Sequence, residues 1–159
     1  MKQVSTLFLK GVVVAIGLAV LALCIYMFPS ITKEMVDVMP VQWELLPILI
    51  SMAISVVPLY IALYQAIKLL NLIDVNKAFS ELSVKALNNI KYCASIIALL
   101  YLAISPVVFM IADRDDAPGV FAIGLIIIFA SIAVATFAAI LQKLLHNAID
   151  IKRENDLTV

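Results

Sequence analysis

The chain has 159 residues, of which 65% are hydrophobic and only 14% are charged, and its mean hydropathy is +1.13. This composition leaves too little polar surface for a soluble domain of this size, so it excludes an ordinary soluble enzyme or binding module. The formal net charge is zero, but the charged residues are distributed unevenly along the chain.

Four stretches lack Asp, Glu, Lys, Arg and His: Gly11–Thr32, Leu45–Ile67, Tyr92–Ala112 and Ala117–Gln142. A hydrocarbon core about 30 Å thick requires about 20 apolar helical residues, and each stretch reaches that length. The sequence therefore predicts an all-α integral membrane protein with four transmembrane helices. We assign the spans to residues 11–30, 45–67, 91–112 and 117–142 of one domain covering residues 1–159, followed by a tail at 143–159.

The basic residues indicate the orientation of these spans. Nine of the eleven precede the first span, lie between the second and third, or follow the fourth: Lys2, Lys10, Lys68, Lys77, Lys85, Lys91, Lys143, Lys152 and Arg153. By the positive-inside rule we expect both termini in the cytoplasm and the protein in a bacterial cytoplasmic (inner) membrane.

The first outer loop follows the first span, and Ile31, Met35 and Val38 recur in it at helical spacing. This rhythm favours a short amphipathic helix on the outer surface, with Tyr26 and Trp43 in the interfacial aromatic belt. The loop is interpreted as a connector rather than as a ligand lid.

Two prolines lie inside predicted spans, Pro58 in the second and Pro106 in the third. Each removes a backbone hydrogen bond and is expected to kink its helix unless a nearby hydroxyl, such as that of Ser55 or Ser105, bonds the freed carbonyl. The prolines are candidate hinges, although kinks that serve only packing are the commoner case.

The inner loop contains a second amphipathic segment. An apolar stripe and a polar face alternate at helical spacing between residues 77 and 91, and Ser80 is the predicted N-cap of a helix that continues into the third span. This helix could rest on lipid headgroups or dock a cytosolic protein. The stripe consists of Phe79, Leu82, Ala86, Leu87 and Ile90, and the polar face includes Glu81 and Lys85.

The second outer loop contains Asp113, Arg114, Asp115 and Asp116. Its spacing does not match a calcium loop, and Arg114 competes for the carboxylates, so no metal site is assigned. We expect Asp116 to cap the fourth span, with Pro118 in its first turn.

No arrangement of residues indicates catalysis or cofactor binding. His146 is the only histidine, no nucleophile and base stand at a suggestive spacing, and no glycine-rich loop is present. Cys24 and Cys93 are expected at opposite depths and so do not predict a disulfide. We therefore expect a protein that is not an enzyme and has no cofactor.

Small residues recur every four positions in the fourth span, at Ser131, Ala135 and Ala139. Such a stripe lets helices approach closely, either within the protein or in a homodimer. The tail beyond it is too short to fold alone and is either a docking strip or a frayed helix end.

Several residues resemble signature positions of the YoaS-like family of four-span bacterial membrane proteins, known as domain of unknown function 2975. They are Phe79-Ser80-Glu81, Ala86-Leu87 with Ile90, and the closing Glu154-Asn155-Asp156-Leu157-Thr158-Val159. Where such proteins often carry a Gly-x-Pro-Phe-Ser type of turn, this chain has Asn76-Lys77-Ala78-Phe79-Ser80.

The resemblance implies a partner, because members of this family are typically encoded beside a small helix-turn-helix regulator. The leading hypothesis is a regulatory membrane protein that holds this regulator at the bilayer, with no nucleic acid contact of its own. The candidate partner surface comprises Phe79, Ser80, Glu81, Lys85, Leu87, Glu154, Asn155, Asp156 and Leu157.

The alternative is a small dimeric transporter or efflux subunit for a neutral or lipophilic solute. Pro58 and Pro106 would be its hinges, and Tyr60, Tyr64, Gln65 and Tyr101 would line its path. The small multidrug exporters depend on an acidic residue inside the first span, which this chain lacks.

Overall fold

The computed structural model describes residues 2–37 and 45–158, and within α1 it leaves the side chains of residues 2, 3, 31, 32 and 34–37 undescribed. The described residues form four long helices: α1 (Lys2–Asp37), α2 (Leu45–Asp74), α3 (Glu81–Arg114) and α4 (Pro118–Leu157). Each contains a window that is long and apolar enough to cross a membrane. The prediction of four membrane-spanning helices is therefore confirmed.

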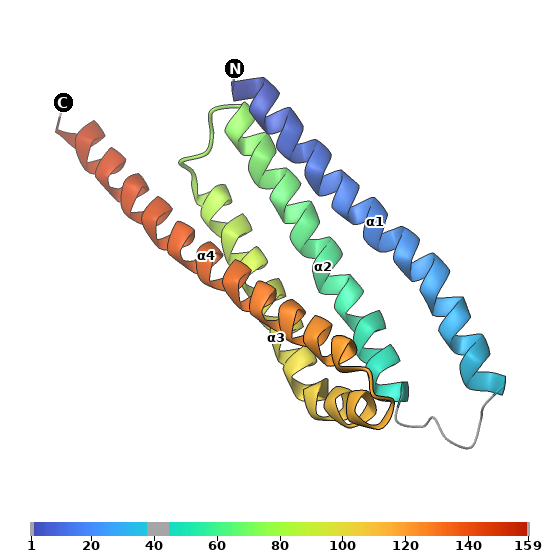
Figure 1. The fold of residues 1–159 in the computed structure, drawn as a ribbon. Coiled ribbons are helices and arrows are strands. Elements are labelled where there is room, and N and C mark those ends of the chain that lie inside the picture. Colours follow the sequence, from blue (N-terminus) through green and yellow to red (C-terminus); the bar gives the residue numbers. More distant parts are fainter. Residues whose placement is uncertain (1, 38–44, 159) are drawn as a thin grey trace.

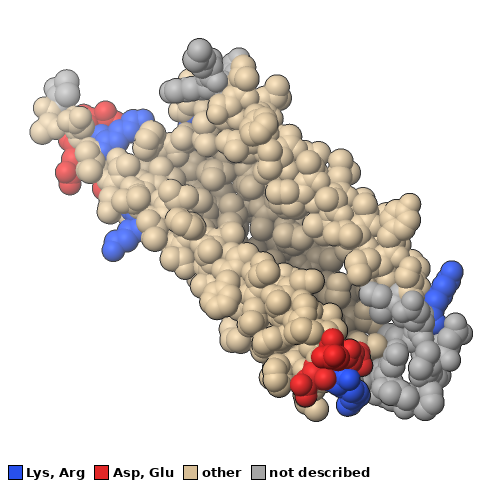
Figure 2. All heavy atoms as spheres, in the orientation of Figure 1, with Lys and Arg blue, Asp and Glu red and all other residues tan. Residues whose placement is uncertain are grey.

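The helices run alternately up and down, so both termini lie at the same end of the molecule (Figure 1). We call this the basic end, because it carries Lys10, Lys68, Lys77, Lys85, Lys91, Lys143, Lys152 and Arg153. The opposite, acidic end carries Asp113, Asp115 and Asp116. On the face seen in Figure 2, the charged side chains gather at these two ends, and the band between them lacks charge.

Contacts between helices follow the order of the chain. α3 packs most extensively on α4 and next on α2, whereas α1 packs only against α2 among the described residues. The small-residue stripe of α4 contributes to the packing on α3, because neighbouring Ala138 is buried and Ser131, Ala135 and Ala139 are half-buried.

The two short loop helices predicted from the sequence are not separate elements in the described part of the chain. α1 continues through Pro29 as far as Asp37, and the inner amphipathic segment is the first part of α3. The rest of the first outer loop, with Val38 and Trp43, lies outside the described residues. Unbroken helices of 36 and 34 residues exceed the 30 Å core, so both project beyond it.

The turn between α2 and α3 closes α2 with a Schellman motif. The Lys77 N–H donates to the Leu72 carbonyl at 2.8 Å and the Asn76 N–H to the Ile73 carbonyl at 3.2 Å. Asn76 has a φ of 58°, the left-handed conformation that this motif requires and that asparagine tolerates well. Asn76 therefore takes the role for which glycine is the commonest residue.

The second outer turn shares the left-handed residue and one of these two bonds, and it corrects the predicted cap of the fourth span. Asp116 has a φ of 51°, and the Ala117 N–H donates to the Ala112 carbonyl at 2.9 Å. Asp116 thus ends α3 instead of starting α4, whose N-cap is Ala117 without a side-chain bond. Pro118 is the first residue of α4, as predicted.

Candidate functional site

The basic end contains a surface formed by two helices far apart in sequence, the start of α3 and the end of α4. α4 extends 15 residues past the last charge-free stretch, from Lys143 to Leu157, a rise of about 22 Å. The tail is thus a continuous part of α4. The Arg153 guanidinium donates to the Glu81 carboxylate at 3.1 Å, which places the tail beside the first turn of α3.

A second set of contacts joins the same helices closer to the membrane core. The Lys91 ammonium donates to the Gln142 side-chain oxygen at 3.3 Å, and the Gln142 amide nitrogen donates to Asn88 at 3.3 Å. Lys91 also lies 5.0 Å from the centre of the Tyr92 ring. These contacts hold α3 and α4 together just below the surface that carries Glu81 and Arg153.

The predicted apolar stripe of the inner helix divides between interior and surface. Leu87 and Ala86 are buried at 6% and 1% exposure, whereas Phe79 and Leu82 are exposed. Leu87 therefore lies inside the molecule and does not contribute to a surface, because it belongs to the face of α3 that packs on its neighbours. We call Phe79, Glu81, Leu82, Lys85, Ile151, Arg153, Glu154, Asn155, Asp156 and Leu157, all of them exposed, the terminal surface.

Ser80 begins α3 in a way that differs from the prediction. It occupies the N-cap position with extended backbone angles, but it makes no side-chain capping bond. Its hydroxyl donates to the Lys77 carbonyl at 2.7 Å, and the hydroxyl of fully buried Ser83 donates to the same oxygen at 3.4 Å. Ser80 therefore stabilises the turn before α3, and its half-buried side chain points toward the protein's own backbone.

The basic end also contains a group of polar contacts that sequence reasoning missed. Asp74, the last residue of α2, accepts hydrogen bonds from the Thr6 hydroxyl and the Lys10 ammonium of α1. The Lys10 and Asp74 side chains are only 25% and 26% exposed. This group, which we call the α1–α2 clasp, is the polar connection between the two helices at the basic end, and Tyr60 adds a hydrogen bond to the Gly17 carbonyl at 2.8 Å deeper in the membrane.

The two candidate hinges differ in how their neighbours compensate for the missing N–H. Proline 106 frees the Leu102 carbonyl, and the Ser105 hydroxyl donates to that carbonyl at 2.8 Å, as predicted. Proline 58 frees the Ile54 carbonyl, but the Ser55 hydroxyl donates to Met52 at 2.8 Å instead, so that part of the prediction was wrong. Both helices continue unbroken through their prolines.

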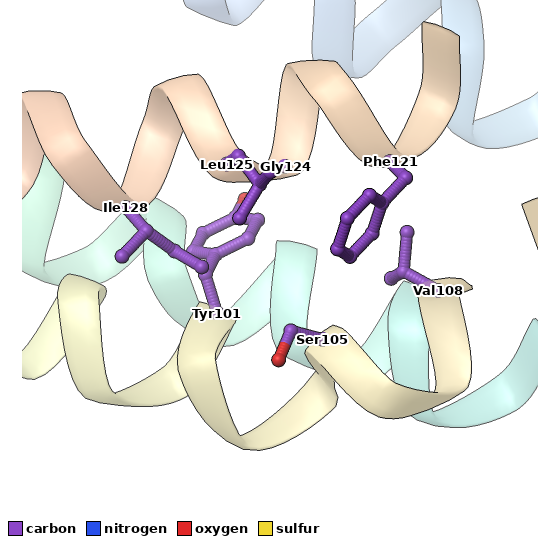
Figure 3. Close-up of a pocket in the computed structure, with 7 residues that line it drawn as sticks. All are labelled: Tyr101, Ser105, Val108, Phe121, Gly124, Leu125 and Ile128. Atoms are coloured by element: carbon purple, nitrogen blue, oxygen red, sulfur yellow. The ribbon is translucent and has the colours of Figure 1, made fainter. Parts of the chain in front are cut away.

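Figure 3 shows the packing between α3 and α4 near the acidic end, where Tyr101, Ser105 and Val108 of α3 lie across from Phe121 and Ile128 of α4. The pocket left between them has a volume of about 10 Å³, about enough for one water molecule. Phe109 and Phe121 meet edge to face nearby, with ring centres 5.2 Å apart. The α3–α4 contact is therefore closely packed along this part of α3, whereas the side chain of Pro106 itself is exposed.

A much larger cavity lies toward the acidic end, where all four helices contribute to its walls. Its volume is about 440 Å³. The face in Figure 2 is hollowed between α4 and the α1–α2 pair. The lining contains no charged residue, and its polar groups are the hydroxyls of Ser55, Tyr101 and Ser131 and the thiol of Cys24.

The four residues of the predicted transport path do not come together in this cavity. Tyr101 lines it, but Tyr60, Tyr64 and Gln65 do not. The Tyr60 hydroxyl donates a hydrogen bond to the Gly17 carbonyl of α1, and Tyr64 is 66% exposed. Gln65 has a buried side-chain oxygen without a hydrogen-bond partner in the structure. The path is thus not a continuous feature of the described residues.

Comparison with known proteins agrees with a membrane protein. The family described as "Protein of unknown function (DUF2975)" matches residues 30–159. The chain belongs to the DUF2975 family. It is also 52% identical over 160 residues to the "Uncharacterized membrane protein YoaS" of Bacillus subtilis (strain 168), with both chains covered completely. The resemblance to a DUF2975 membrane protein is therefore confirmed. No solved structure matches the chain.

Proposed function

We propose that the protein is a regulatory protein of the bacterial cytoplasmic membrane whose terminal surface binds and sequesters a cytosolic helix-turn-helix transcription regulator. One observation carries the proposal. The Arg153–Glu81 ion pair joins the α4 tail to the start of α3, the two elements that the sequence marked for partner binding.

The proposed orientation follows from charge. Eight of the eleven Lys and Arg residues lie at the basic end among the described side chains, and the positive-inside rule assigns such an end, with both termini, to the cytoplasm. The terminal surface then faces the cytosol, where a soluble regulator can reach it.

The chemistry of the terminal surface suits a protein partner. Its large apolar side chains are well exposed, at 50% for Leu82, 65% for Ile151 and 86% for Leu157. Charges of both signs surround them, from Glu81, Lys85 and Arg153 to Glu154 and Asp156. Apolar anchors within a charged rim are typical of helical docking surfaces.

Sequestration requires only binding. A regulator held at the bilayer is kept from its DNA, and it is released when binding weakens. In this account the membrane protein performs no chemical step and does not itself contact DNA.

The proposal is tested with a helix-turn-helix regulator encoded near the gene, the kind of partner that the family resemblance implies, by measuring how it divides between membranes and cytosol. We expect the intact protein to hold the regulator on membranes, and we expect truncation after Lys152 or Phe79→Asp to release it. Lys33→Glu, an exposed charge change on α1 outside the terminal surface, serves as the control. A regulator that stays cytosolic with the intact chain, or that remains bound to both variants, would overturn the proposal.

The large cavity favours a second candidate, transport of a neutral or lipophilic solute by a dimer. In that case purified protein in lipid vesicles would move such a solute across the membrane, and the Phe79→Asp variant would do so equally well. Regulator binding without vesicle transport supports the first proposal and counts against the second.

A further inference from the structure

The cavity between the four helices has the properties of a binding site for hydrocarbon. Residues from every helix line it, among them Leu23 and Met27 of α1, Met52 and Leu59 of α2, Ile97 of α3 and Ile127 of α4. All of these belong to the charge-free stretches, so the medium around the cavity is the bilayer core. Its volume of about 440 Å³ falls within the range of about 300–1,000 Å³ typical of small-molecule sites.

The polar pair in the wall, Ser55 and Tyr101, is already satisfied. The Ser55 hydroxyl uses its one hydrogen on the Met52 carbonyl at 2.8 Å. The Tyr101 hydroxyl lies 3.3 Å from the Ser55 oxygen, so tyrosine is the donor in this contact. Neither hydroxyl of the pair retains a hydrogen for a ligand, so only the Ser131 hydroxyl and the Cys24 thiol remain as donors in a lining that is otherwise apolar. This lining favours an apolar chain over a polar solute.

The size of the cavity also distinguishes a lipid from a helix of a second copy. An α-helix with its side chains is about 10–12 Å across, so 440 Å³ would hold roughly 4–6 Å of its length, about one turn. A flexible acyl chain can fill the same volume from the surrounding bilayer. It would also restore dispersion contacts that the lining residues lack.

We propose that this cavity binds one acyl chain of a membrane lipid, which bridges α1 and α4. Those two helices do not pack against each other in the described part of the chain, and each lines the cavity. The bound chain therefore supplies a contact that the helices themselves do not make. This inference is independent of the proposed regulatory function.

The test uses the full chain in nanodiscs of phosphatidylethanolamine and phosphatidylglycerol, with a small fraction of phosphatidylglycerol carrying a diazirine on one acyl chain. After photolysis, mass spectrometry maps the labelled residues. We expect Met27 and Met52 in the cavity to be labelled several-fold more than Phe129 and Phe137, which are exposed at 67% and 66%.

Ala130→Phe fills the cavity, whereas Ala133→Phe makes the same change three residues along α4 at a position that does not line it. We expect the first variant to lower cavity labelling several-fold and the second to leave it unchanged. If Ala130→Phe does not fold, Ala53→Phe is used in its place, because Ala53 lines the same cavity from α2. Cavity labelling no higher than at Phe129 and Phe137, or equal labelling in the filled and control variants, would overturn the proposal, and so would a dimeric protein with an unlabelled cavity.

Discussion

At the residue scale, the α1–α2 clasp is the clearest example of a contact that sequence reasoning did not predict. Lys10 lies one residue before its charge-free stretch and Asp74 lies seven residues after its own. Counting from the ends of the spans therefore places the two at different depths. They meet because α1 and α2 are offset along their axes, and hydrophobic periodicity contains no information about that offset.

Asp74→Asn is expected to lower the thermal unfolding temperature of the protein in detergent. The asparagine amide has nearly the same shape as the carboxylate but lacks the negative charge that pairs with half-buried Lys10. It also accepts the hydrogen bonds from Thr6 and Lys10 less strongly. Circular dichroism against temperature measures the effect. Lys10→Ala should lower the temperature as well, and the double variant should lower it by less than the sum of the two.

The matched control for this prediction is Asp150→Asn. Asp150 makes only an exposed contact with His146, at 3.7 Å one helical turn away, and such pairs contribute little to stability. Equal unfolding temperatures for wild type, Asp74→Asn and Asp150→Asn would show that the clasp does not stabilise the fold.

At the scale of elements, the sequence predicted the four helices and several of their ends, including the start of α3 after Ser80 and Pro118 at the start of α4. It did not predict which residues satisfy the helix ends. Asp116 is a common N-cap residue type, yet the last turn of α3 reaches far enough to put it in the left-handed position of a Schellman motif. Such assignments depend on the exact final turn, which sequence patterns do not define.

Ser105→Ala is expected to lower the free energy of unfolding by about 1 kcal/mol, because it removes the hydroxyl that bonds the carbonyl freed by Pro106. Thr136→Ala is the control. The Thr136 hydroxyl also bonds a carbonyl one turn back, at Ile132, but inside α4, where no proline removes the regular helical donor. Titration of the protein in lipid–detergent bicelles with a denaturing detergent gives the free energies.

The proline provides an internal check on this interpretation. In a Pro106→Ala background the backbone N–H returns, so Ser105→Ala should then cost little. The account of Pro106 is contradicted if Ser105→Ala is as harmless as Thr136→Ala, or if its cost is the same in both backgrounds.

At the scale of the whole molecule, the count of four spans and the position of both termini at one end could be predicted, because charge-free length and an even number of crossings determine them. The order in which the helices contact one another could not be predicted, because an apolar helix face can pack equally well against lipid or against another helix. The cavity was missed for the same reason. Its lining residues are ordinary span residues, and only their arrangement around a gap distinguishes them.

The terminal surface could be predicted from the sequence only in part. The sequence predicted that the start of α3 and the end of α4 would form it. The predicted set of residues included Leu87, which is buried, and left out Ile151, which is 65% exposed. The contact between Arg153 and Glu81 joins residues 72 positions apart and depends on how far α4 continues past the membrane. That length follows from tertiary packing as much as from helix propensity.

The most direct test of the terminal surface is photocrosslinking in living cells from two isoleucines of α4. Ile151 on the terminal surface and Ile126 in the membrane span are both 65% exposed, so the protein's own atoms cover a photoreactive amino acid equally little at either position, and the two differ in facing the cytosol or the lipid. If the terminal surface binds the helix-turn-helix regulator, we expect a light-dependent adduct from position 151 and none from position 126. No adduct from position 151, or equal adducts from both, would contradict it.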